Sequence, residues 1–196
     1  MKKIGNIFFS ILILAGSLLS AEALAQEESQ KNFEGVEFLT GFGWGKLKLQ
    51  GDYHVYPLVV DFDFNLKPMI KKLNLSPRPL WQFQIEPFIS YVDRPSSDLE
   101  TGLSFMLKIG VLPQTSRFQP FLIGGAGLIY ITEHTYEEAG EFNFIEQAGI
   151  GLHYFFTHDT AFTVQGRYRH LSNADTGYPN RGINNQFILT GISKRF

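Results

Sequence analysis

Hydrophobic and polar side chains alternate along much of the chain with a period of two residues. In residues 80–91 every odd position is apolar or aromatic, and four of the even positions carry Gln, Glu or Ser. In residues 100–111 the odd positions after Thr101 are apolar, while the even positions include Ser and Lys. Such alternation predicts β-strands whose two faces meet different environments. The length suits a tilted strand that crosses a bilayer, about 9–11 residues, better than an average soluble strand of about 5–6 residues.

The chain offers eight segments of this kind. An even number of long antiparallel strands closes into a small transmembrane barrel whose interior is filled by side chains. We therefore predict an all-β fold, an eight-stranded antiparallel transmembrane β-barrel, with strands at 35–49, 53–65, 80–92, 100–112, 120–132, 143–156, 161–172 and 184–196. Because a buried charge needs a partner, we expect the inward-facing polar side chains to pair: Gln82, Glu86, Lys108, Gln147, Arg167 and Arg169.

Two of these segments are less regular than the others. In the first, Leu47 and Leu49 change parity relative to Phe38 and Trp44, which indicates a bulge or an earlier strand end. The segment 120–132 is apolar on both faces, so its orientation in the barrel stays open.

Residues 1–25 have the features of a secretory signal peptide. A basic start precedes an apolar stretch at 7–19, and the small residues Ala23 and Ala25 mark a cleavage site. We expect this segment to be removed, which leaves 26–196 as a single barrel domain. An uncleaved N-terminal anchor is the alternative.

Sequence parity does not say which face of the barrel is apolar. A soluble lipocalin-like barrel holds its apolar side chains inside, whereas a membrane barrel turns them toward lipid. The chain ends in Phe196, and a terminal aromatic residue resembles the ending of many outer-membrane barrels. Together with the strand lengths and the signal segment, this ending favours the outer membrane of a Gram-negative bacterium.

Composition excludes several kinds of chemistry. The chain has no Cys, so it has neither disulfides nor a catalytic thiol. Its net charge of −2 argues against nucleic acid as a partner. His54, His134, His153 and His158 lack the paired spacing of metal ligands, so we expect no metal. The oligomeric state is left open.

His170 and Ser172 are the strongest candidates for chemistry. They stand two residues apart in a predicted strand, so their side chains point to the same face. A base beside a hydroxyl can activate that hydroxyl as a nucleophile. Since Phe162 and Tyr168 share this face, the pair suits a lipid substrate.

The strand order assigns a side of the membrane to each loop if both ends of the barrel are periplasmic. His170 and Ser172 then lie at the depth of the outer leaflet. The long link 66–79 lies on the periplasmic side, and we expect a helical turn in it. Four links face outward: 50–52, 93–99, 133–142 and 173–183.

Two short motifs resemble those of a known family. Residues 169–174 read Arg-His-Leu-Ser-Asn-Ala, and residues 178–184 read Tyr-Pro-Asn-Arg-Gly-Ile-Asn. They resemble the lipid A 3-O-deacylase family of outer-membrane barrels, which are also described as acyloxyacyl hydrolases. The resemblance implies an esterase without a cofactor that removes the acyl chain at position 3 of lipid A, with lipopolysaccharide in the outer membrane as its substrate. It also implies Ser172 as nucleophile, His170 as general base and Asn173 as part of the oxyanion hole.

The chain departs from this family at one catalytic position. The best-known members carry a Glu at the start of the last strand, where this chain has Asn184. An amide can hold the tautomer of the His ring but lacks the full charge that stabilises an imidazolium, and this replacement costs about 10⁴ in turnover in a serine protease. The alternatives are a slower enzyme, a His–Asn arrangement of the kind that cysteine proteases use, or another acid.

Glu146 is the candidate for another acid. It shares its face with the apolar side chains of segment 143–156, and a short turn at 157–160 joins this segment to the next as a hairpin. Matching the apolar faces places Glu146 opposite either His170 or Ser172, with its Cβ within about 5–8 Å of the base. A Glu146 that faced the lumen would contradict this hypothesis.

A second class of function stays open. A non-catalytic barrel, serving as a structural anchor or a surface interaction protein, would show the same strand pattern together with a decayed motif. A solute channel is disfavoured, because eight strands leave little lumen.

Overall fold

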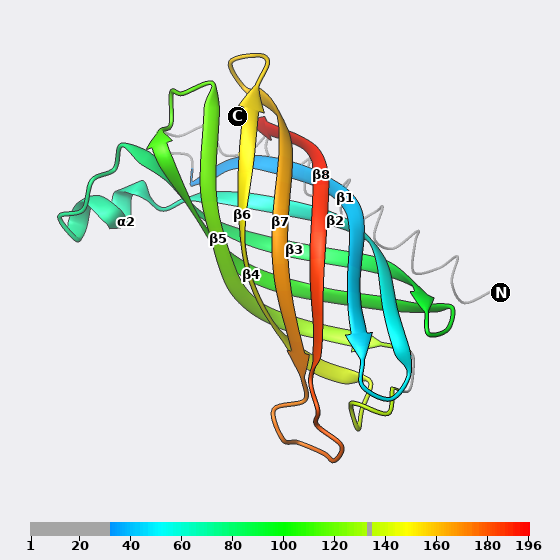
Figure 1. The fold of residues 1–196 in the computed structure, drawn as a ribbon. Coiled ribbons are helices and arrows are strands. Elements are labelled where there is room, and N and C mark those ends of the chain that lie inside the picture. The colour runs from blue at the N-terminus through cyan, green and yellow to red at the C-terminus, as the bar shows by residue number, and fades with distance from the viewer. Residues whose placement is uncertain (1–31, 133–134) are drawn as a thin grey trace, which may run out of the picture. The chain divides into compact units, whose positions relative to one another are not determined.

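The computed structural model describes residues 32–132 and 135–196, so the expected signal segment 1–25 lies outside the described residues. Eight antiparallel strands close into a barrel in which each strand pairs with the next and β8 pairs with β1 (Figure 1). The predicted all-β, eight-stranded fold is confirmed. The strands are β1 Phe33–Leu47, β2 Gly51–Asn65, β3 Pro79–Arg94, β4 Asp98–Pro113, β5 Phe118–Ile131, β6 Phe142–Phe155, β7 Thr160–Ser172 and β8 Ile183–Arg195.

Alternation along the strands sorts the side chains into an interior and an exterior set. In β3 the polar side chains of Gln82, Gln84 and Glu86 are buried, and their apolar neighbours face outward. Large apolar side chains such as Phe38 and Ile150 are more than half exposed on the outer surface. This is the arrangement of a membrane barrel and the reverse of a lipocalin-like closure.

An apolar cluster fills the barrel at the end where β7 ends and β8 begins, which we call the outer end. Its buried side chains come from seven of the eight strands. Ile129 and Ile131 of β5 belong to this cluster, whereas Leu128 and Tyr130 face outward. The cluster therefore explains why β5 is apolar on both faces: one face meets the cluster and the other faces lipid.

The same cluster explains the change of parity near the end of β1. Leu47 points into it and is 2% exposed, and β1 keeps one register with β2 from Gly35 to Leu47. The alternative of a bulge here is therefore wrong, and the alternative of an earlier strand end is right. Leu49 lies exposed in the turn that follows.

Buried charges pair across the barrel below the apolar cluster. Arg169 donates two hydrogen bonds of 2.9 Å to the carboxylate of Glu100, and Arg167 Nη1 donates to Glu86 Oε2 at 2.6 Å. Both pairs connect β7 to strands on the opposite wall, β4 and β3. The predicted pairing of inward-facing polar residues is confirmed for the others as well: Gln82 bonds Glu34, Lys108 bonds Glu37, and Gln147 bonds Ser104.

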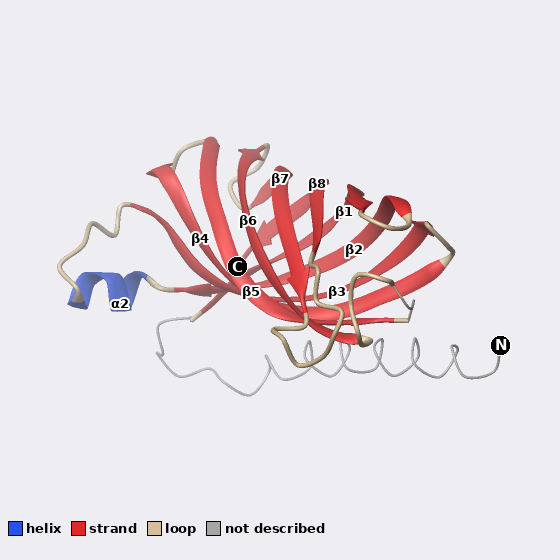
Figure 2. Cartoon of the chain, turned by 60° about the horizontal axis from the view of Figure 1, so that its bottom comes forward, coloured by secondary structure: helices blue, strands red, loops and turns tan. Residues whose placement is uncertain are grey.

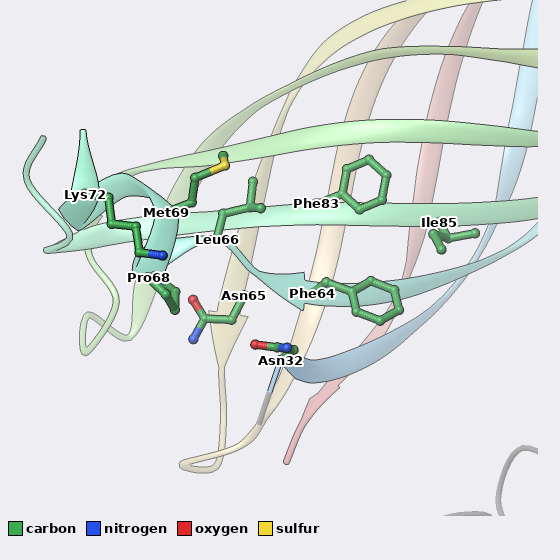
Figure 3. Close-up of a pocket in the computed structure, with 9 residues that line it drawn as sticks. All are labelled: Asn32, Phe64, Asn65, Leu66, Pro68, Met69, Lys72, Phe83 and Ile85. Atoms are coloured by element: carbon green, nitrogen blue, oxygen red, sulfur yellow. The ribbon is translucent and has the colours of Figure 1, made fainter. Parts of the chain in front are cut away.

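The link between β2 and β3 contains the expected helical turn, α2 (Lys67–Lys72). It lies at the inner end of the barrel, opposite the β7–β8 loop, and appears teal in Figure 1 and blue in Figure 2. An open cavity of about 510 Å³ separates α2 from the outer faces of β2 and β3 (Figure 3). No helix in the described ranges is long and apolar enough to cross a membrane.

The ion pairs inside the barrel give a testable difference in stability. We expect Glu100→Gln to lower the free energy of unfolding by about 3–5 kcal/mol, because it leaves the guanidinium of Arg169 buried without a charged partner. Urea unfolding of the full-length chain in lipid vesicles measures this loss. Asp159→Asn is the matched control, since its pair with Lys194 is exposed at the inner end and should leave the midpoint unchanged. Equal midpoints for Glu100→Gln and wild type would contradict the importance of the buried pair.

Candidate active site at the outer end of β6, β7 and β8

Strand β7 carries fixed charges on its inner face and the candidate chemistry on its outer face. Arg167 and Arg169 point inward to their carboxylate partners. The alternation of the strand then turns His170 and Ser172 outward, where both are half-buried at the outer end. The two residues predicted to act together therefore share one face of one strand, as expected.

Two neighbouring strands place a polar residue on either side of His170. Asn184 of β8 and Glu146 of β6 are both its direct partners in strand pairing. The Oδ1 atom of Asn184 lies 2.7 Å from Nδ1 of His170. Since an amide oxygen only accepts hydrogen bonds, Nδ1 carries the proton and Nε2 keeps a free lone pair.

Of the two registers predicted for Glu146, the structure has the one opposite His170, but the carboxylate makes no hydrogen bond with the His170 ring within the described ranges. Glu146 is exposed on the outer face, not turned into the lumen. In the described part of the chain, the one side-chain hydrogen bond of the ring is the bond that Nδ1 donates to Asn184 Oδ1. Asn184 rather than Glu146 therefore orients the ring in this structure.

Ser172 and Asn173 stand at the exit of β7 into the β7–β8 loop (173–182). No hydrogen bond joins the hydroxyl of Ser172 to His170 among the described contacts. The amide of Asn173 donates to the carbonyl oxygens of Gly177 at 3.2 Å and Pro179 at 3.0 Å. The side-chain donors that Asn173 would offer to an oxyanion are thus used within the loop, where the side chain is buried.

A buried carboxylate that the sequence analysis did not identify lies behind the site. Glu138, from the β5–β6 loop (132–141), is 5% exposed. Its Oε2 accepts the backbone N–H of Asn173 at 3.0 Å, and its Oε1 accepts that of Gly182 at 2.7 Å. Burial raises the pKa of Glu138 above its ordinary value, while these backbone donors and nearby His170 act in the opposite direction.

Neither motif nor spacing pointed to Glu138. In a loop of unknown conformation, two consecutive Glu residues are typical of a solvated turn. The carboxylate is buried because the β5–β6 loop contacts the β7–β8 loop. Glu138 and Asn173, which bond each other there, are 35 residues apart in the sequence. A pattern based on the spacing of neighbouring residues cannot detect such a contact.

Gly182 provides space for the His170 ring. Its φ of +70° lies in the left-handed region that favours glycine. A Cβ atom at this position would lie 2.6 Å from Cε1 of His170. Gly182, at the end of the β7–β8 loop, therefore also lies against the imidazole ring of His170 and limits the space available to it.

Metal chemistry has no support among the described residues. In residues 32–132 and 135–196, no three His, Asp or Glu side chains gather where they could hold a metal ion. The groups available at this site are a hydroxyl, an imidazole, amides and carboxylates. These groups suit acyl transfer to a serine.

Comparisons with known proteins give a family and related barrel structures. A protein-family model described as "Lipid A 3-O-deacylase (PagL)" matches residues 62–193, more than half of the chain. The crystal structure of the outer membrane enzyme PagL superposes with a TM-score of 0.57 at 15% identity, over 78% of this chain and 97% of that one. Neisserial surface protein A (NspA) superposes with a TM-score of 0.64 at 12% identity, over 83% and 97%. No curated protein sequence matches the chain.

We expect Gly182→Ala to displace the His170 ring and break its hydrogen bond to Asn184. The added Cβ meets the ring, and a non-glycine residue in the left-handed region costs about 1–2 kcal/mol. Side-chain NMR of His170 reports the hydrogen bond, and urea unfolding reports the free energy.

Gly51→Ala is the matched control for this variant. Gly51 also has a positive φ, of +88°, but a Cβ there would meet nothing within 4 Å. It should lose only the backbone contribution, with the His170 signals unchanged. An unchanged Nδ1 signal in Gly182→Ala would show that the glycine does not set the ring position.

Proposed function

Since the chain belongs to the lipid A 3-O-deacylase (PagL) family, we propose that it hydrolyses the 3-O-linked acyl ester of lipid A with Ser172 as nucleophile and His170 as general base. The family and the barrel fold locate the chain in the outer membrane of a Gram-negative bacterium. The observation that carries the mechanism is the hydrogen bond from His170 Nδ1 to Asn184. It leaves Nε2 free to accept a proton, on the same strand face as Ser172.

The proposed reaction has two steps. Nε2 of His170 takes the hydroxyl proton of Ser172 while Oγ bonds to the ester carbonyl carbon. The bond to the sugar oxygen then breaks, and that oxygen takes the proton from His170 and leaves as a hydroxyl. Water attacks the acyl-enzyme with His170 again as base, which releases the fatty acid and restores Ser172.

The position of the pair fits a substrate that arrives through the bilayer. The outer face around it includes Phe144, which pairs with Ser172, and Tyr168, and both are about half exposed. Acyl chains can therefore lie against the outer wall without entering the packed lumen. Catalytic hydrogen bonds often tighten only when the substrate is bound, which is how we account for the missing bond between Ser172 and His170.

Asn173 remains the proposed oxyanion donor. Its amide would have to exchange a bond inside the loop for one to the developing oxyanion, and the contact with Gly177 O, at 3.2 Å, is the longer of the two. The neutral amide of Asn184 holds the tautomer of His170 but does not supply the charge of an acid. We therefore expect slower turnover than in a Ser–His–acid enzyme.

The rival proposal is a non-catalytic barrel that acts as an anchor or a surface interaction protein. It is favoured by the amide at position 184 and by a fold that NspA, named as a surface protein, shares. The two proposals differ in whether Ser172 is needed for a chemical change in lipid A.

We expect Ser172→Ala to reduce deacylation by about 10²-fold, because it removes the covalent route from an enzyme that already lacks the third acid of a triad. Mass spectrometry of lipid A from cells that express each variant detects the loss of one hydroxyacyl chain. Ser97→Ala is the control, since Ser97 is exposed in the β3–β4 loop at the same end and bonds Tyr91. Identical lipid A spectra for wild type and Ser172→Ala, with both proteins folded in the outer membrane, would favour the non-catalytic barrel.

The same assay distinguishes the two candidates for orienting His170. Asn184→Ala should lower the rate strongly, because it removes the bond to Nδ1, and Glu146→Gln should change it little. The reverse order would restore Glu146 as the acid.

A further inference from the structure

We propose that Glu138 is a positioning residue that provides, from behind the site, the negative charge that Asn184 does not supply to His170. This inference rests on the proposed function, since it concerns how His170 acts as a base. It names a residue outside the two sequence motifs and from a different loop.

Hydrogen bonds attach Glu138 to both ends of the β7–β8 loop. Asn173 directly follows Ser172 in the chain, and its backbone N–H donates to one carboxylate oxygen of Glu138 at 3.0 Å. Gly182, whose Cα faces the His170 ring, gives its N–H to the other at 2.7 Å. One carboxylate thus holds the residue next to the nucleophile and the residue against the base.

Because the carboxylate of Glu138 is buried, its charge can act on His170 with little screening by solvent. The two groups interact electrostatically, and the carboxylate is 5% exposed. A charge shielded from water keeps more of its effect than an exposed one, which solvent and salt screen. Formation of an imidazolium during proton transfer is therefore favoured by Glu138, whereas Asn184 contributes only its hydrogen bond.

The other charged groups around this pair have different partners or lie in the open. Glu146 is exposed on the outer face, and Arg181 is exposed in the β7–β8 loop. The remaining groups are bonded elsewhere: Glu137 accepts the N–H of Leu49, Asp175 accepts from Asn180, and Lys48 donates to the carbonyl of Arg181. Of these carboxylates, Glu138 is the one that bonds both Asn173, next to Ser172, and Gly182, next to the His170 ring.

The test compares Glu138→Gln with Glu137→Gln in the full-length chain. Glu137 is the matched control, because it is the adjacent buried carboxylate of the same loop and accepts a backbone N–H from a different loop. Two quantities are measured: the NMR titration midpoint of the His170 ring, and kcat for lipid A as a function of pH. Loss of the charge in Glu138→Gln should lower the midpoint relative to wild type and lower kcat about tenfold, with Glu137→Gln close to wild type in both.

The Asn184→Glu background separates charge from loop structure. If Glu138 acts by its charge, an acid at position 184 should leave Glu138→Gln with little effect on the His170 midpoint or on kcat. If Glu138→Gln instead disrupts the loop, both quantities should fall in this background as well. Equal midpoints in wild type and Glu138→Gln, or an equal loss in both backgrounds, would overturn the proposal. Since the midpoint needs no substrate, an inactive wild type would count against the proposed function without deciding this inference.

A separate observation, at the other end of the barrel, carries a second inference. The structure assigns to the cavity under α2 a binding site for one anionic phospholipid of the periplasmic leaflet. The cavity opens on the membrane-facing side of β2 and β3, and Phe64, Phe83 and Ile85 form its apolar wall (Figure 3). Lys72 and Asn65 line the same cavity.

Charge complementarity identifies the occupant. The segment from Leu66 to Ile85 contains four basic side chains and no acidic one. Lys71 and Lys72 form the exposed last turn of α2, and Met69, which lines the cavity, is about half exposed beside them. A phosphate head group at the lysines with an acyl chain on the phenylalanine wall matches both halves of this surface.

Short anchoring contacts hold the segment in this place. Lys67 N donates to Asn65 Oδ1 at 2.9 Å, and Trp81 Nε1 donates to the carbonyl of Ser76 at 3.2 Å. Ile70 is 4% exposed and fixes the buried side of α2. The cavity is therefore a formed site and not the gap beneath a free loop.

Native mass spectrometry of the full-length chain tests this site. The chain is released from nanodiscs of phosphatidylethanolamine with a minority of phosphatidylglycerol, and the retained lipids are identified. Wild type should retain phosphatidylglycerol severalfold above its share in the disc, and Lys71→Gln/Lys72→Gln should lose this enrichment. Lys46→Gln/Lys48→Gln, which removes two lysines at the outer end, should keep it.

Each other result contradicts the site. Retained lipid that matches the composition of the disc would show no selectivity for an anionic head group. Equal loss in both double variants would show that total charge, rather than α2, attracts the lipid. Barrel folding of every variant is checked by its heat-dependent electrophoretic mobility.

Discussion

The pairing of buried charges across the lumen is the constraint on which the rest of this structure depends. A barrel of eight strands has little room for water in its interior, so a charge buried deep inside it needs a partner of opposite charge. Arg167 and Arg169 meet theirs on the opposite wall, at Glu86 and Glu100. These bonds fix the rotation of β7 about its own axis, and with it the direction in which the outward side chains point.

The candidate site lies on the outward face of β7, the strand that these ion pairs hold from inside. Because neighbouring residues of a strand point in opposite directions, Arg169 inside and His170 outside are held by the same backbone. The loop after β7 needs separate support, since it has no place in the strand ladder. Glu138 gives this support through two backbone N–H groups. Rigid strands and a clamped loop together give the kind of support that the proposed catalysis would require, in which the reacting groups are held by rigid elements.

Regular alternation made most of this structure predictable from sequence. Strand number and the inward set of polar residues follow from a period of two. Together with a short hairpin turn, that period also narrowed the partner of Glu146 to His170 or Ser172, and the structure has His170. The orientation of β5 did not follow, because an apolar cluster inside the barrel gives that strand two apolar faces. Contacts between loops were also out of reach, since the burial of Glu138 and the loop bonds of Asn173 depend on three-dimensional proximity alone.

The bond that orients His170 has a consequence for how the protein is made. His170 donates it to Asn184 on β8, the last strand of the barrel, whose pairing with β7 brings the two side chains together and whose pairing with β1 closes the sheet. A slip of one residue in the pairing of β7 with β8 would turn Asn184 toward the lumen. A partly assembled chain in transit through the periplasm therefore lacks an oriented base. If the proposed function holds, hydrolysis therefore becomes possible only after β8 has paired with β7 in this register.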